Sequence, residues 1–382
     1  MKKRKVLYIS GTRADYGLMR HTLRCMKESP NLDIEIVAAG MHLMAEFGNT
    51  VTEIEKDKFR LHRMQIVYSQ DNKESMSIFL GRFVQALTVK ISEIKPDVIL
   101  LLGDRAEMLG GAIVGVYLTI PIVHIHGGEV TSTVDELARH AITKLSHLHL
   151  VATQRSRQRI ISMGEEPWRV RVVGAPGLDS IKHEEVIPKK ELYKRFHLRL
   201  TEPFLILIQH PNTFELTEVR KQIIETMEAI NSLKYQTIVI YPNADAGGRE
   251  IIREIEKYRH LPFIRTFKSL PYRDYVNLLR NASALVGNSS SGIIEAPYFK
   301  LPAINIGTRQ DGRERAENII DVPYRRNKII TAIRKALCDE AFKERVRRCQ
   351  NPYGQGRAGG KIANILRRIK LDQKLLQKRI IY

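Results

Sequence analysis

The stretch Asp97-Val-Ile-Leu-Leu-Leu-Gly-Asp-Arg105 decides the fold class. Val98 to Leu102 is apolar without interruption, which predicts a strand covered on both faces of a parallel sheet. A glycine and two charged residues follow the strand, and an Ala- and Gly-rich helical pattern begins at Ala106. A strand, a polar turn and a helix in this order indicate a parallel βαβ unit.

The same alternation continues in both directions. In the first half we expect strands at 6–10, 32–39, 97–102, 121–125 and 149–152, and helices at 16–28, 106–118 and 134–146. In the second half we expect strands at 204–208, 237–241, 263–265, 284–286 and 303–306, and helices at 218–233, 249–258, 272–280 and 292–299. The pattern predicts an α/β protein with two doubly wound, Rossmann-like domains and an active site in the cleft between them.

The expected domain boundaries follow the loss of periodicity between residues 174 and 203. We predict an N-terminal Rossmann-like domain at 1–175, a linker region at 176–202, a C-terminal Rossmann-like domain at 203–358, and a basic helix at 359–382 that packs back on the first domain.

The net charge of +20 is concentrated near the C-terminus, because residues 323–382 contain 17 Lys and Arg against 4 Asp and Glu. This basic segment could bind nucleic acid or a membrane surface. We favour a helix over 361–379 that buries its apolar side and leaves its basic side in solvent. Aromatic residues for base stacking are nearly absent there, so we expect neither nucleic acid nor membrane as a partner.

Several other classes of protein are disfavoured. No apolar stretch approaches the 18 or so residues of a membrane span, and the run at 6–11 is too short for a signal peptide. The three cysteines, Cys25, Cys338 and Cys349, have no paired metal spacing, which predicts free thiols in a reducing cytoplasm. We expect no metal and no cofactor.

Polar residues gather at the strand ends of the first half. Gly11-Thr-Arg-Ala-Asp-Tyr-Gly17 follows the first strand and is a weak signal alone, while Asp104 and Arg105 follow the strand at 97–102, where Asp104 could also cap a helix. His124-Ile-His126-Gly-Gly-Glu129 comes next, followed by a helix with Asp135, Arg139 and His140 near its start. This density of imidazoles and carboxylates favours acid–base chemistry over a metal site.

The second half carries the features of a nucleotide site. Gly287-Asn-Ser-Ser-Ser-Gly292 lies between a strand and a helix, where backbone N–H groups and hydroxyls suit a phosphate or pyrophosphate. Glu295 could reach a ribose hydroxyl, and Arg309 and Arg313 could neutralise phosphates. His210 and Asn243 follow two neighbouring strands, although a lone histidine is more often structural. Together the two halves predict an enzyme that acts on a nucleotide conjugate.

The order of these motifs resembles the hydrolysing UDP-N-acetylglucosamine 2-epimerase family, from about residue 5 to residue 360. The resemblance implies a GT-B-like fold and the conversion of UDP-N-acetylglucosamine and water to N-acetylmannosamine and UDP, by anti elimination to a glycal and hydration. A sister branch, similar over the whole chain, takes UDP-N,N'-diacetylbacillosamine and leads to legionaminic acid. A GT-B glycosyltransferase is the more distant alternative, and it would need an acceptor.

The resemblance also implies roles for individual residues. The residues that it implies as catalytic are Asp104, His126, Glu129, Asp135 and His210. The residues that it implies as UDP- or substrate-binding are Arg13, Tyr16, Arg105, Arg139, His140, Asn243, Gly287, Ser289, Ser290, Glu295, Arg309 and Arg313.

Two matters stay open. Many family members have Glu where this chain has His126, so the C2 base could be His126 or Glu129. The substituents at C4 and C6 of the sugar are not decided by these motifs, and we expect the segment at 64–77 to contact them. The resemblance further implies a homodimer or homotetramer.

Overall fold

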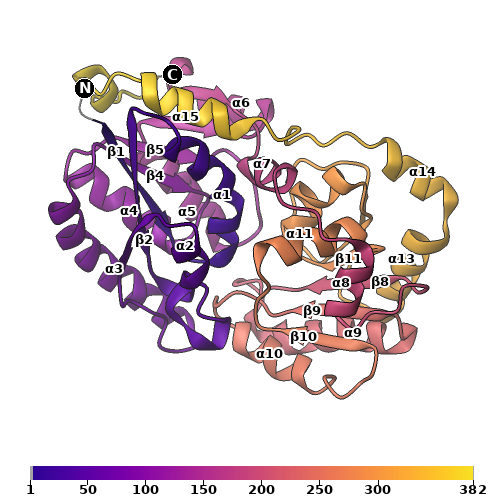
Figure 1. Ribbon diagram of the computed structural model, residues 1–382. Coiled ribbons are helices and arrows are strands. Elements are labelled where there is room, and N and C mark those ends of the chain that lie inside the picture. The colour runs from indigo at the N-terminus through magenta and orange to yellow at the C-terminus, as the bar shows by residue number, and fades with distance from the viewer. Residues whose placement is uncertain (1–2, 382) are drawn as a thin grey trace. The chain divides into compact units, whose positions relative to one another are not determined.

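The structure is a computed structural model that describes residues 3–381, and it divides into two compact units (Figure 1). Unit 1 contains the chain up to Glu129, Val134–His183, and the segment from Tyr353 onward. Unit 2 contains Val130–Thr133 and Glu184–Pro352. Each unit has its own parallel sheet, so the predicted pair of doubly wound α/β domains is confirmed.

The sheet of unit 1 has seven parallel strands in the order β3-β2-β1-β4-β5-β6-β7. The strands are β1 (Arg4–Ser10), β2 (Leu32–Ala38), β3 (Arg60–Arg63), β4 (Val98–Leu102), β5 (Ile122–Ile125), β6 (Leu148–Val151) and β7 (Val170–Val172). All five residues of β4 are buried, as its apolar sequence requires. Strand order reverses between β1 and β4, and the carboxyl ends of these two strands are where such sheets bind ligands.

Helices cover both faces of this sheet. The helices are α1 (Arg13–Lys27), α2 (Val51–Lys56), α3 (Lys73–Ile94), α4 (Ala106–Tyr117), α5 (Val134–Leu145), α6 (Gln154–Ser162), α7 (Pro176–Lys182), α15 (Ala358–Arg368) and α16 (Gln373–Leu376). Helices α3, α4 and α5 pack side by side, and α1 packs with α7 and α15 (Figure 1). Residues of β1, β4, α1 and α15 share one hydrophobic core.

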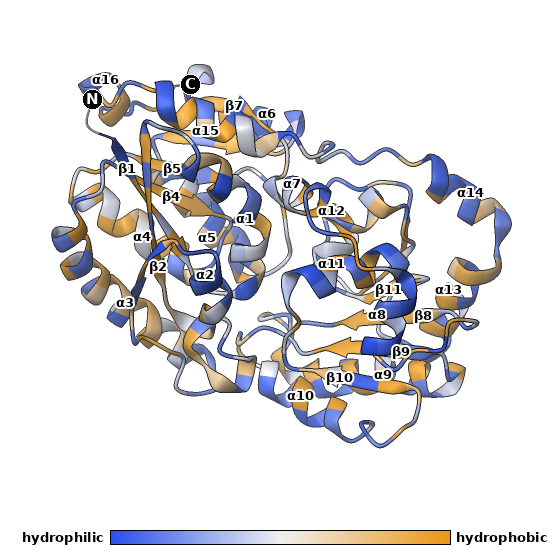
Figure 2. Cartoon of the chain, viewed as in Figure 1, coloured by the Kyte–Doolittle hydropathy of each residue, from blue (hydrophilic) through white to orange (hydrophobic). Residues whose placement is uncertain are grey.

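The sheet of unit 2 has six parallel strands in the order β10-β9-β8-β11-β12-β13, which is the same doubly wound order. The strands are β8 (Phe204–Ile208), β9 (Gln236–Ile240), β10 (Ile264–Phe267), β11 (Ala284–Gly287), β12 (Ala303–Ile306) and β13 (Ile319–Val322). Strand β8 is coloured hydrophobic, as its sequence of five apolar residues requires, whereas α14 is mostly hydrophilic (Figure 2). The order reverses between β8 and β11, so residues that follow these strands lie at the ligand-binding edge.

Two hydrophobic cores lie on the two faces of this second sheet. The helices are α8 (Lys189–Arg195), α9 (Val219–Leu233), α10 (Gly248–Glu256), α11 (Tyr272–Asn281), α12 (Ser291–Ile294), α13 (Arg326–Cys338) and α14 (Glu340–Arg348). The helix expected at 292–299 is broken, because α12 has only four residues and a 3-10 turn over Ala296–Phe299 follows it. Pro297 explains the break, because its backbone nitrogen carries no hydrogen to donate to the preceding turn of a continuing helix.

The observed boundaries differ from the predicted ones. The stretch predicted as a linker at 176–202 contains α7, which belongs to unit 1, and α8, which belongs to unit 2. Leu178 and Leu192 are fully buried, so both helices contribute to cores instead of spanning solvent. The chain passes from one unit to the other near His183, and it returns at Tyr353, a few residues before the predicted position 359.

The basic C-terminal segment is not one helix. Helix α15 ends at Arg368, and the short helix α16 follows. Ile362 and Leu366 are fully buried against unit 1, whereas Arg367 and Arg368 are exposed. Within residues 3–381, no helix has the length and apolar character needed to cross a bilayer.

Candidate functional site

The turn after β1 is organised by Asp15. The carboxylate of Asp15 accepts hydrogen bonds from the amides of Gly11 and Thr12, at 3.0 and 2.8 Å, and the Thr12 hydroxyl accepts from the amide of Asp15. This capping box starts α1 and makes Arg13 its first residue. Three residues further on, Tyr16 is fully buried and its hydroxyl donates to Asp57 at 2.6 Å. The side chain of Tyr16 therefore lies in the core, and its predicted contact with the substrate stays a prediction.

Behind this turn lies a buried polar cluster that the sequence did not indicate. The Ser10 hydroxyl bonds both the Asp15 carboxylate and His42 Nε2, the latter at 2.8 Å, and His42 Nδ1 lies 2.9 Å from the Thr50 hydroxyl. Burial raises the pKa of Asp15 to about 6, with a further increase from Glu107, although the Ser10 hydrogen bond opposes the increase. Burial, with Arg13 and Arg105 nearby, lowers the pKa of His42 to about 3. His42 is therefore a neutral structural imidazole.

Arg139 joins three of the acidic residues of unit 1. Its guanidinium contacts the Asp104 carboxylate, the Glu136 carboxylate at 2.7 Å, and the Glu129 carbonyl oxygen at 3.1 Å. The Arg139 side chain is 1% exposed, whereas the Asp104 and Glu136 side chains are 21% and 20% exposed. Burial alone would lower the pKa of Arg139, but the charges of Asp104, Glu129 and Glu136 raise it above its ordinary value. Asp104 is thus paired with a buried guanidinium on one side, and its outer side reaches solvent.

His126 and Glu129 form a second pair in the loop after β5. His126 Nδ1 bonds the Glu129 carboxylate, and both side chains are largely buried. His126 has a φ of +63°, a conformation that non-glycine residues seldom adopt and that surrounding contacts must hold. Gly128 has a φ of +74° and its carbonyl accepts from Arg159. The main chain therefore fixes the direction of the His126 ring.

The N-terminal half of α5 carries two further predicted residues, Asp135 and His140. Asp135 lies in the first turn and is partly exposed. His140 Nε2 lies 2.9 Å from the Glu136 carboxylate, which also binds Arg139. Sequence reasoning did not select Glu136 as a site residue, although its i, i+3 and i, i+4 spacing to Arg139 and His140 was readable.

Arg105 is held by partners that the sequence analysis missed. Its Nε lies 3.3 Å from the fully buried Glu107 carboxylate, and its Nη2 donates to the Tyr68 hydroxyl at 3.3 Å. Tyr68 also donates to Glu107 at 3.3 Å and stacks on Phe79. The segment at 64–77 therefore contacts the loop that carries Asp104 and Arg105.

In unit 2, the loop after β11 depends on a glycine. Gly287 has a φ of +124°, and a Cβ at this position would lie 2.0 Å from the carbonyl oxygen of Ile208. No other residue fits there. Ser289 and Ser290 follow and are partly exposed, whereas Ser291 is buried against Tyr275. Because α12 is so short, its dipole is weaker than the sequence suggested, and the hydroxyls and nearby arginines carry more of any anion binding.

Asn288 ties together the loops at this edge. Its side-chain amide donates to the His210 carbonyl at 2.8 Å, and its side-chain oxygen accepts from the His210 amide at 2.7 Å. Its own carbonyl oxygen accepts from the Gln310 side chain at 2.8 Å and from Arg309 at 3.5 Å. Asn288 is fully buried and was not selected from the sequence, although it lies within the serine-rich motif.

His210 is oriented by the backbone of the neighbouring loop. His210 Nδ1 accepts from the amide of Asn243 at 3.1 Å, so the Nε2 atom is the ring nitrogen left for other partners. Arg309 and Arg313 are partly exposed in the loop after β12, and Glu295 is buried at the end of α12. The structure thus brings His210, Asn243, Ser289, Ser290 and Arg309 to one edge of the second sheet.

Each unit is therefore a doubly wound domain whose polar residues lie at its topological switch point. Within residues 3–381, no group of three His, Cys, Asp or Glu side chains could hold a metal ion. In each unit the residues predicted to form the site follow the carboxyl ends of the strands, with ionisable groups in unit 1 and a serine-rich loop in unit 2, and this edge is where doubly wound domains bind ligands.

Comparison with known proteins gives the family. The profile of the UDP-N-acetylglucosamine 2-epimerase family matches residues 24–367, and this chain belongs to that family. It is 40% identical over 376 residues to a UDP-N,N'-diacetylbacillosamine 2-epimerase (hydrolyzing) of Legionella pneumophila, covering 98% of each chain. It is 34% identical over 333 residues to a UDP-N-acetylglucosamine 2-epimerase of Neisseria meningitidis, covering 87% of each chain.

Solved structures agree on the fold. The crystal structure of a UDP-GlcNAc 2-epimerase from Neisseria meningitidis bound to UDP-GlcNAc superposes with a TM-score of 0.80 at 18% identity, covering 95% of this chain and 99% of that chain. The predicted GT-B-like fold, with two Rossmann-like units, is therefore confirmed.

Proposed function

We propose that this protein is a hydrolysing UDP-sugar 2-epimerase. The observation that carries the proposal is the Asp104–Arg139 pair beside the His126–Glu129 pair, at the carboxyl ends of adjacent strands β4 and β5. Elimination and hydration across C1 and C2 of a sugar need a group that removes a proton and a group that returns one, and two separate ionisable pairs can supply both. A glycosyl transfer alone does not need so many carboxylates.

The proposed reaction has two balanced steps. A base takes the proton from C2 while the C1–O bond to UDP breaks, which leaves UDP and a glycal. Water then adds its hydroxyl to C1, and a proton is delivered to C2 on the opposite face, so that C2 is inverted. Asp104 and the His126–Glu129 pair are the candidates for base and acid, and Asp135, in the first turn of α5, is a further candidate.

In unit 2 we propose that Ser289, Ser290, Arg309 and Arg313 bind the pyrophosphate, with Glu295 on the ribose and His210 directing its Nε2 atom to the substrate. Hydrogen bonds from hydroxyls and arginines to phosphate oxygens are charge-assisted and strong, and they also stabilise UDP as it leaves. Substitution of Ser290 or Arg309 should therefore raise the Kd for UDP.

For the sugar, we propose UDP-N,N'-diacetylbacillosamine as the first substrate to test, because the 40% identical relative carries that name. UDP-N-acetylglucosamine is the second candidate, supported by the 34% identical relative. A competition assay that mixes the two UDP-sugars and measures each free sugar decides between them.

The reaction class is tested by product analysis in D2O. A hydrolysing 2-epimerase should release UDP and free sugar in equal amounts, with deuterium at C2. Recovery of only an epimerised UDP-sugar would exclude hydrolysis, and turnover that depends on an added acceptor would favour a glycosyltransferase.

Asp104→Asn tests the acid–base site. This variant should bind UDP normally and lose turnover by about 10² to 10⁴-fold, which is the usual contribution of one acid–base group. Asp33→Asn, which removes an exposed carboxylate paired to Arg60 at 3.6 Å in the same unit, is the matched control and should keep normal turnover. Near-normal kcat in Asp104→Asn would exclude a catalytic role.

A further inference from the structure

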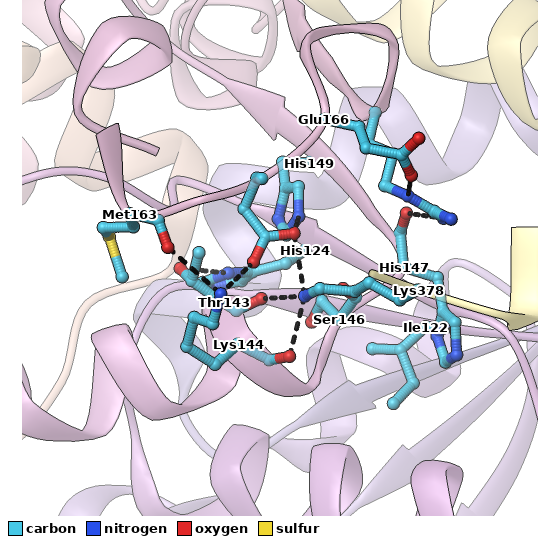
Figure 3. A network of polar contacts seen from close by, with 12 residues as sticks. Ile122, His124, Thr143, Lys144, Ser146, His147, His149, Met163, Glu166 and Lys378 are labelled. Atoms are coloured by element: carbon cyan, nitrogen blue, oxygen red, sulfur yellow. Dashed lines mark hydrogen bonds and ion pairs between the residues drawn. The ribbon is translucent and has the colours of Figure 1, made fainter. Parts of the chain in front are cut away.

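The ammonium group of Lys378, near the C-terminus, lies at the C-terminal end of α5. Lys378 Nζ donates to the carbonyl oxygens of Thr143, Lys144 and Ser146 at 3.1, 2.7 and 2.8 Å (Figure 3). The last carbonyls of a helix have no partner within the helix, and a cation placed there is favourable. Lys378 therefore binds the end of the helix whose first turn carries Asp135.

A buried carboxylate holds this cation in place. Glu165 lies 2.9 Å from Lys378 Nζ and also bonds Lys144 Nζ at 2.8 Å and His149 Nε2 at 3.2 Å. The Glu165 side chain has no exposed surface, and the Lys378 side chain is 14% exposed. Burial lowers the pKa of Lys378 to about 8, although Glu165 opposes the decrease.

The segment around Lys378 is anchored at further points. The guanidinium of Arg169, which is fully buried, donates to the carbonyl oxygens of Lys374, Leu375 and Gln377 at 2.9, 2.7 and 3.2 Å. The amide of Ile381 donates to the carbonyl of Gly164 at 3.0 Å. These contacts fix the main chain of the tail, so the position of Lys378 is set by the body of unit 1.

Two routes lead from Lys378 to the acid–base residues. The first route is helix α5, because Arg139 on this helix contacts the Asp104 carboxylate and donates to the Glu129 carbonyl oxygen. The second passes through Thr143, whose hydroxyl lies 3.3 Å from His124 Nδ1, while His124 Nε2 donates to the Gly103 carbonyl at 2.8 Å. Gly103 immediately precedes Asp104, so both routes end at the same carboxylate.

We propose that Lys378 is a positioning residue of the acid–base site. It fixes the C-terminal end of α5 and thereby the placement of Arg139 and Asp104. The inference rests on the proposed function, since it assigns Asp104 to the chemistry. Displacing a catalytic group by about 1 Å can lower a rate by about 10²-fold, so a residue that touches no substrate can still control kcat.

The experiment compares Lys378→Met with Arg379→Met in the full-length protein. Both variants remove one positive charge from the tail, but Arg379 is exposed and makes none of the contacts to α5. We expect kcat of Lys378→Met to fall by about 10-fold or more with KM changed less than about twofold, and Arg379→Met to match the wild type. Scanning calorimetry of the unit 1 transition gives the fraction of each variant in which unit 1 is folded.

A third variant and a fold measurement complete the test. Lys378→Arg keeps a cation and several donors and should recover most of kcat. The proposal is overturned if kcat of Lys378→Met equals that of Arg379→Met, if kcat falls only in proportion to the fraction of protein with unit 1 folded, or if every Lys378 variant fails to fold. An inactive wild type would instead refute the proposed function.

Discussion

The Arg139→Met variant should destabilise unit 1 and stop turnover. Arg139 is buried and pairs with Asp104 and Glu136, so its removal takes away the guanidinium charge beside both carboxylates, although Glu136 keeps its contact with His140. Breaking a buried ion pair from one side costs roughly 3–5 kcal/mol. About a fifth of each carboxylate side chain reaches solvent, which favours the low end, about 3 kcal/mol.

Scanning calorimetry with and without UDP checks this value. For a unit of this size, about 3 kcal/mol corresponds to a decrease of roughly 6–12 °C in the midpoint of the unit 1 transition. The transition of unit 2, which UDP is proposed to stabilise, should not move. Arg155→Met, which removes an exposed arginine from α6, is the control and should stay within about 0.5 kcal/mol of the wild type.

A double-mutant cycle separates lost charge from lost packing. If uncompensated carboxylates cause the destabilisation, Glu136→Gln should cost less in the Arg139→Met background than alone, by roughly 0.5–3 kcal/mol. Equal costs in both backgrounds, or an Arg139→Met midpoint that matches the Arg155→Met control, would refute the electrostatic account of this cluster.

Three further predictions concern other parts of the chain. Asn288→Ala should weaken binding of the UDP-sugar and lower the free energy of unfolding of unit 2 by roughly 3 kcal/mol, because the amide and carbonyl of His210 lose their partners. Titration with the UDP-sugar checks the binding, and scanning calorimetry checks the stability. Gly287→Ala should abolish UDP binding, since its Cβ would collide with the carbonyl of Ile208; a normal Kd would contradict the structure. Burial lowers the pKa of His42 to about 3, so the contribution of its neutral form to stability is present above the ordinary pKa of 6.5 and is lost as pH falls toward 3. Between pH 6 and 4, the free energy of unfolding of His42→Asn should therefore fall less steeply than that of the wild type, by roughly 1.4 kcal/mol per pH unit. Denaturation midpoints measured across this pH range check the difference.

The fold and the edge of each sheet that carries the site could be predicted from the sequence for one physical reason. Apolar strands followed by polar turns require parallel strands buried on both faces, and their carboxyl ends share an edge. The stretches after β1, β4, β8 and β11 therefore come together in pairs whatever the connecting helices do. Asp104 and Ser290 were predicted this way, from position at a strand end and residue type, and the structure places both at such ends.

Other features depend on details that local patterns do not specify. Tyr16 lies in a motif of polar residues, but the capping box at Thr12 starts α1 in a register that buries the Tyr16 side chain in the core. Helix α3 was not expected, although its buried residues Phe79, Phe83, Leu87 and Ile91 follow a spacing of four that was readable. Lys378 could not have been found, because nothing near it in the sequence indicates a partner 234 residues away.

His126 is expected to stand where many members of the family have a glutamate, and the main chain sets the placement of its side chain. The left-handed main chain at His126 and the turn at Gly128 set the direction of the side chain, whichever residue stands there. Glu129 then orients the ring by bonding Nδ1, and the Nε2 atom becomes the one that can exchange a proton with a substrate. A carboxylate at the same position would face Glu129 directly, and two like charges so close cannot both stay ionised without cost. An imidazole beside one carboxylate avoids that repulsion, because the neutral ring carries no negative charge. We therefore propose that His126 and Glu129 act together as one acid–base unit in this loop.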